Sequence, residues 1–146
     1  MAVDRLRAAW WSRGTDEVLR VGLDSGLEEA VLTARRQGLL NELDVFLAVL
    51  VETAMSVLRP TTSSPLVPFM AIDTQGRPLE EHEIGPGSRH VIEAMAAAHN
   101  GHREEVFSVA RKIKVLPGRD RAEGVLLVFH LALFAAGEAR KIRNNV

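Results

Sequence analysis

Two stretches of this sequence are apolar around the whole circumference of an α-helix, and they constrain the fold more than any other feature. Every residue over 45–51 is apolar, within a predicted helix over 41–58. The second stretch, over 125–136, is interrupted only by His130 and lies in a predicted helix over 120–142. A helix that is hydrophobic nearly all round is buried on most sides. A chain of 146 residues must therefore cover two such helices with few remaining elements.

Capping residues and apolar periodicity predict the remaining helices. Glycines and prolines separate them, and each predicted helix ends near one of these residues. The shorter helices are expected over residues 3–12, 15–22, 25–37, 88–98 and 102–114. With the two apolar helices they give a mainly α fold. We expect a compact multi-helix domain of six to seven helices, in which residues 1–146 form a single α-helical domain.

The segment over 60–87 does not fit the helical pattern, because it holds five of the six prolines. Within it, the apolar run Phe69–Ile72 is followed by the turn-forming residues Asp73–Gly76. This order is typical of a small β-hairpin, which we place near residues 67–80. An irregular proline-rich loop is the alternative.

The composition excludes several classes of chemistry. The chain has no cysteine, which rules out disulfide scaffolds, thiolate metal sites, iron–sulfur clusters and cysteine nucleophiles. We predict no cofactor and no metal. Residues 1–16 lack the continuous apolar core of a secretory signal. The longest apolar run has 12 residues, fewer than the roughly 20 that span a bilayer, so we expect a cytoplasmic protein with no membrane contact.

The two apolar helices also bear on the oligomeric state. One of them can be wrapped by the other helices, but a second is harder to cover in a chain of this size. Large exposed apolar patches are unusual in monomers, and a symmetric dimer covers such a patch with a second copy of itself. We therefore expect a homodimer with one apolar helix at or near the interface. The alternative is a monomer in which the short amino-terminal helices cover the excess.

Basic residues gather near the break between the last two predicted helices. The segment over 101–146 holds nine bases and five acids, and clusters of this kind are typical of phosphate-binding surfaces. Against a nucleic-acid site, the pI is near 6.5 and no aromatic residue is interleaved for stacking on bases. We favour a solvated helix end, and the candidate residues for an anionic partner are Arg111, Lys112, Lys114, Arg119 and Arg121.

Histidine is the other candidate for chemistry. His130 interrupts an apolar stretch, and a buried imidazole needs a hydrogen-bond partner. We expect a core histidine bonded to a carbonyl group or to Glu52, with a ligand contact or a pH-sensitive interface residue as alternatives. Four more histidines lie near glutamates, but their spacing matches no metal-ligand pattern. We interpret them as solvated or hydrogen-bonded side chains: His82, His90, His99 and His102.

No arrangement of residues in the sequence is typical of a catalytic site, so we predict no catalytic residue. We favour a non-enzymatic helical protein that acts as a homodimer in protein–protein interaction, for example as an adaptor. One alternative is a nucleic-acid-associated protein that uses the basic cluster over 111–121. The other is a small-molecule-binding protein or enzyme with a pocket near His130.

Overall fold

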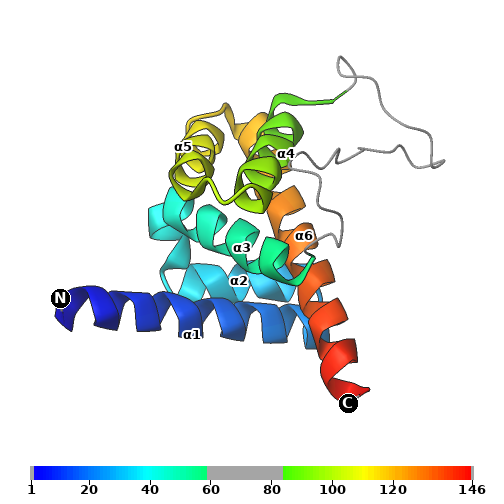
Figure 1. Cartoon of the computed structure of the whole chain (residues 1–146). Coiled ribbons are helices and arrows are strands. Elements are labelled where there is room, and N and C mark those ends of the chain that lie inside the picture. The colour runs from blue at the N-terminus through cyan, green and yellow to red at the C-terminus, as the bar shows by residue number, and fades with distance from the viewer. Residues whose placement is uncertain (1, 59–83, 146) are drawn as a thin grey trace.

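Helices make up almost all of the described part of the protein, as the sequence predicts. The computed structural model describes residues 2–58 and 84–145, with side chains from residue 10 onward. No β-strand occurs in these residues (Figure 1), and the hairpin considered near residues 67–80 lies outside them. The elements are the helices α1 (Ala2–Ser25), α2 (Leu27–Arg36), α3 (Leu43–Val57), α4 (Pro86–His99), α5 (Arg103–Lys114) and α6 (Gly118–Asn144), and the short 3-10 helix η1 (Leu39–Glu42).

Helix α3 is the centre of the fold. In Figure 1 it lies between a lower layer of α1 and α2 and an upper layer of α4 and α5, while α6 runs along the side of both layers. Aromatic rings continue this core into two neighbouring helices. The ring of Phe46 lies 6.1 Å from that of Trp11 in α1 and 5.7 Å from that of Phe129 in α6. Seven of the 15 residues of α3 are buried: Phe46, Leu47, Ala48, Leu50, Val51, Ala54 and Met55.

Helix α1 is one continuous helix, so the prediction of two short helices broken at Gly14 is wrong. The glycines that we took as breaks are points of close packing. A Cβ atom at Gly14 would lie 3.0 Å from Leu39, and one at Gly22 would overlap the side chain of Leu133. Each glycine costs helix stability of about 1 kcal/mol relative to alanine. The close approach of η1 and α6 to α1 offsets that cost, and local sequence rules do not include it.

Helices α4 and α6 approach each other through their backbones. A Cβ atom at Gly87 would overlap the carbonyl oxygen of Asp120 and lie 2.6 Å from the backbone nitrogen of Gly124. Helix α4 also starts two residues earlier than predicted, at Pro86. Ser88, the first residue of the predicted helix, does not cap α4. It donates a hydrogen bond of 2.6 Å to the Glu123 carboxylate of α6. Pro86 suits the first position of a helix, where a missing N–H costs nothing, and the first turn of α4 lies against α6.

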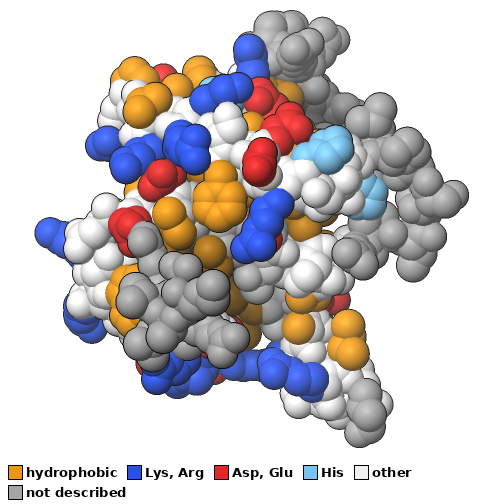
Figure 2. Space-filling view, turned by 60° about the vertical axis from the view of Figure 1, so that its left-hand side comes forward, with side chains coloured by type: hydrophobic (Ala, Val, Ile, Leu, Met, Phe, Trp, Pro, Cys, Tyr) orange, Lys and Arg blue, Asp and Glu red, His pale blue; other side chains and the backbone are white. Residues whose placement is uncertain are grey.

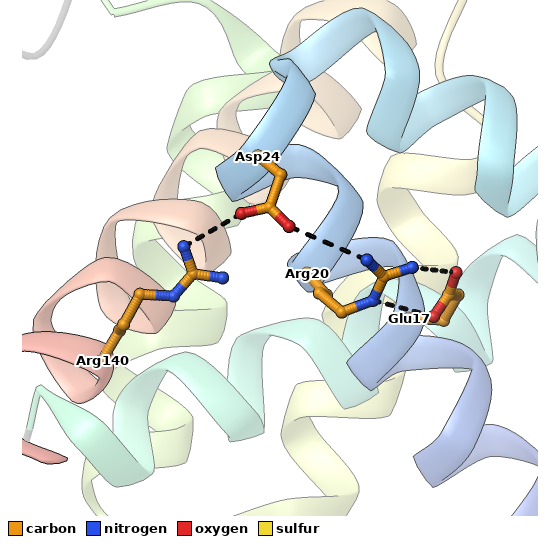
Figure 3. Close-up of polar contacts among 4 residues, drawn as sticks. All are labelled: Glu17, Arg20, Asp24 and Arg140. Carbon is orange, nitrogen blue, oxygen red and sulfur yellow. Dashed lines mark hydrogen bonds and ion pairs between the residues drawn. The ribbon is translucent and has the colours of Figure 1, made fainter. Parts of the chain in front are cut away.

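A row of charged side chains joins α1 to the carboxyl-terminal part of α6 (Figure 3). Arg20 donates to the Glu17 carboxylate at 2.6 Å, and this hydrogen bond lowers the pKa of Glu17. Asp24 lies 3.7 Å from Arg20 and accepts a hydrogen bond of 3.1 Å from Arg140. Exposed pairs of this kind contribute little stability each. The pair between Arg140 and Asp24 is the one of these contacts that links α6 to α1.

Candidate functional site

One face of α6 is not covered by the rest of the described structure. Leu126, His130 and Phe134 follow one another at intervals of four residues and so lie on one side of the helix. Leu126 is 42 % exposed and Phe134 is 60 % exposed, and His130 is exposed between them. We call these three residues the α6 stripe. The residues of α6 that are buried lie on the opposite side: Gly124, Val128, Phe129, Ala132 and Ala135.

The stripe exists because α6 is longer and more apolar than the bundle can cover. The helix has 27 residues, a length of about 40 Å, and the helices of the bundle pack only along its inner side. Helix α3 is thus the covered apolar helix of the two predicted from the sequence, and α6 is the less covered one.

The hydropathy of α6 also bears on membranes. Among the described residues it is the one helix that is long and apolar enough to cross a bilayer, judged by length and composition alone. Our estimate from the sequence counted only the 12 residues over 125–136, in which His130 is the one polar residue. Only 28 % of the most apolar 18-residue window of α6 is buried. A lipid surface is therefore a rival to a protein partner as the occupant of the stripe.

His130 is not the core histidine that we expected. Its side chain is exposed, and none of the three hollows described below includes it. Glu52, the carboxylate that we considered as its partner, instead forms an ion pair of 3.3 Å with Nε of Arg103. The expectation failed because an apolar sequence neighbourhood does not show which side of a helix faces the core.

The basic cluster is partly neutralised within the fold. Nε of Arg111 and Nζ of Lys114 lie 4.0 Å and 3.6 Å from the carboxylate of Asp44, so these two cations link α5 to α3. Lys112, Arg119 and Arg121 are exposed. Two of the five predicted residues thus have a structural partner, which weakens the case for a phosphate-binding surface.

The histidines do not gather into a metal site. His90 lies 3.5 Å from Glu93, and His102 lies 3.4 Å from Glu105, each pair three residues apart on one helix. Within residues 2–58 and 84–145, no group of three or more histidine, aspartate or glutamate side chains could hold a metal ion. His82 lies outside the described residues.

Three hollows meet along the open edge of α3, which carries three of its four polar residues, Glu52, Thr53 and Ser56. Figure 2 views the molecule from this side, where hydrophobic side chains line a depression bordered by charged ones. The first hollow, about 300 Å³, lies beside the turn between α4 and α5 and includes His99. The sequence did not predict this surface, although the polar breaks in an otherwise apolar helix mark where it lies.

The second hollow has a volume of about 450 Å³ and is formed by α1, α3 and α5. We call it the Trp11 hollow; its lining includes Trp11, Thr15, Val49, Glu52, Arg103 and Phe107.

The third hollow, about 880 Å³, lies between α1, the end of α3 and the carboxyl-terminal half of α6. Alanines of α6 line it, and two arginines of Figure 3 lie at it, Arg20 and Arg140. Both arginines already pair with carboxylates of α1. Their positive charge is therefore partly neutralised and is less available to an anionic ligand.

Comparison with known proteins does not assign a family. No protein-family model matches the chain, and neither the curated proteins nor the solved structures include a match to it.

Proposed function

We propose that this protein is a non-enzymatic helical interaction protein that self-associates as a homodimer through the α6 stripe. The observation that carries the proposal is the exposure of Phe134, 60 % of whose surface faces solvent on an apolar helix face. Contiguous exposed apolar surface on a folded protein marks a site of contact with another protein or with a membrane.

The spacing of the stripe favours a second copy of the same chain. In a two-fold symmetric dimer, if one residue contacts a second residue of the partner, the second contacts the first in return. Leu126 and Phe134 are equally far from His130 along the helix. Two α6 helices that cross in antiparallel orientation at His130 therefore place each Leu126 against the partner's Phe134. No charged residue interrupts the helix from 124 to 137.

The adaptor role follows from the position of the stripe. With α6 at the interface, the hollowed face along the edge of α3 stays accessible in both copies. A dimer built in this way presents two identical faces to further partners. Charged residues around the depression in Figure 2 fit the polar rim that protein interfaces commonly have.

The first test is sedimentation velocity on the full chain over a wide concentration range, with flotation on vesicles of zwitterionic and anionic phospholipid in parallel. We expect the 16.0 kDa chain to form a dimer of 32 kDa, twice that mass, and to stay in solution when vesicles are added. A monomer at every concentration that floats with the vesicles contradicts the proposal and assigns the stripe to lipid. A protein that is monomeric at every concentration and does not float with the vesicles also contradicts the proposal.

A further inference from the structure

Two buried polar atoms on α1 have no hydrogen-bond partner. They are Nε1 of the Trp11 indole and Oγ1 of the Thr15 hydroxyl, on residues that are 5 % and 2 % exposed. Buried polar groups in proteins nearly always have a partner, so each exception requires a physical reason. The two residues are four positions apart, which places their side chains one turn apart on the same face of the helix.

Both residues line the Trp11 hollow. Its volume of about 450 Å³ lies within the roughly 300–1,000 Å³ of small-molecule sites. Val45 and Val49 of α3 and Phe107 of α5 provide apolar lining. Six of the ten lining residues are polar or charged, and the apolar wall consists of Trp11, Val45, Val49 and Phe107. Sites for small organic molecules combine an apolar wall with polar groups that fix the orientation of the ligand.

The two unpartnered groups determine what the polar end of such a molecule must offer. Each atom exposes less than 1 Å² in the free chain, so a ligand must displace the side chains that cover them. An indole N–H is only a donor, so the atom that meets it must be an acceptor. The threonine hydroxyl can donate to the same atom, and a carbonyl oxygen has two lone pairs with which to accept both hydrogen bonds. A single carbonyl group therefore satisfies both orphaned groups.

The charges around the hollow select against an anion. Its lining contains the carboxylates of Asp16 and Glu52 and one guanidinium, that of Arg103. That guanidinium is already held by Glu52 at 3.3 Å. A carboxylate or phosphate ligand would meet more negative than positive charge, whereas a neutral molecule meets no such repulsion.

We propose that the Trp11 hollow binds a small, uncharged aryl amide or aryl ketone. Its carbonyl oxygen accepts hydrogen bonds from Trp11 Nε1 and Thr15 Oγ1, and its ring lies against Val49 and Phe107. The site is formed by α1, α3 and α5 and is separate from the α6 stripe. It adds recognition of a small molecule to the interaction role proposed above and does not depend on it.

The chain permits a direct test by nuclear magnetic resonance, because its two tryptophans give two indole N–H signals. N-methylbenzamide and the larger 2-naphthamide are the probes, and benzoate and ethylbenzene are the charged and apolar controls. We expect saturable downfield movement of the Trp11 signal with the amides, larger than that of Trp10, which is 40 % exposed. No saturable shift with either amide, or equal binding of benzoate or ethylbenzene, overturns the proposal.

Substitution of Thr15 separates recognition from folding. Thr15→Val replaces a hydroxyl that has no partner with a methyl group of the same shape, so we expect it to leave the fold intact or to stabilise it. The same change should weaken binding of N-methylbenzamide about tenfold, while Thr15→Ser retains it. Unchanged affinity in Thr15→Val contradicts the site. So does a long-lived water at the Trp11 indole that the probe does not displace.

Discussion

Replacement of Phe134 by alanine tests the proposed dimer at its most exposed apolar residue. Burying a whole phenylalanine side chain contributes about 1.5 to 3 kcal/mol. Because 60 % of Phe134 is exposed in the single chain, covering that exposed part contributes roughly 0.9 to 1.8 kcal/mol per copy. Both copies lose this contribution in a symmetric dimer, so the total is about 2 to 3.5 kcal/mol.

This free energy converts directly into an affinity. At 1.4 kcal/mol for each factor of ten, we expect Phe134→Ala to raise the dimer dissociation constant about 30- to 300-fold. The measurement is sedimentation equilibrium at several loading concentrations. Because the side chain is largely exposed, the free energy of unfolding of the monomer should change by no more than about 0.5 kcal/mol.

The matched control is Val115→Ala. Val115 is 80 % exposed, at the end of α5 and away from the stripe, so its loss should leave the dissociation constant unchanged. Equal effects of the two substitutions would show that general surface hydrophobicity, and not the stripe, drives association. An unchanged dissociation constant in Phe134→Ala would refute the assignment of the interface to this face of α6.

Three further predictions concern the fold and its charges. Gly87→Ala places a methyl group against the backbone of α6 and should lower the free energy of unfolding, measured in urea, by about 1 to 3 kcal/mol. The control is Gly118→Ala, which should have no such effect because the added Cβ meets nothing within 4 Å. The pKa of Glu17 is lowered in the folded state by its hydrogen bond from Arg20. The stability that this adds is present above the unfolded-state pKa and disappears as the pH falls through the folded-state pKa. Glu17→Gln should therefore lower the melting temperature slightly at pH 7 and not at pH 2. We expect the wild type to bind duplex DNA at physiological salt no more tightly than a non-specific binder, as measured by fluorescence, and the charge reversal Lys112→Glu to leave this binding unchanged. Sub-micromolar binding by the wild type that Lys112→Glu abolishes would restore the nucleic-acid hypothesis.

The helices could be predicted from the sequence because the signals for them are local. The apolar run over 45–51 indicates a helix, and five of its seven residues are buried in the structure. The spacing of Val106, Val109 and Ile113 indicates a helix and its buried side, and all three residues are buried. Gly14 was misinterpreted, because its low helix propensity is visible in the sequence while its contact with Leu39 is not. Where distant residues decide the outcome, a local pattern is not sufficient.

The sites were harder to predict for the same reason. Asp44 neutralises part of the basic cluster, yet it lies some 70 residues from Arg111 in the sequence. His130 lies in an apolar run, but which side of α6 faces the core depends on how α3 and α4 pack against it. The unpartnered groups of Trp11 and Thr15 become visible only once the surroundings of both atoms are known.

The most direct test of the dimer is a disulfide crosslink at its symmetry axis. The chain has no cysteine, so His130→Cys introduces a single thiol. Helices packed about 10 Å apart, with Cα atoms about 2.3 Å from each axis, bring the facing Cα atoms within roughly 5.5 Å, the usual separation across a disulfide. We expect rapid and nearly complete crosslinking of His130→Cys under mild oxidation and none of Val115→Cys. Slow crosslinking of both variants alike would contradict an antiparallel dimer through the α6 stripe.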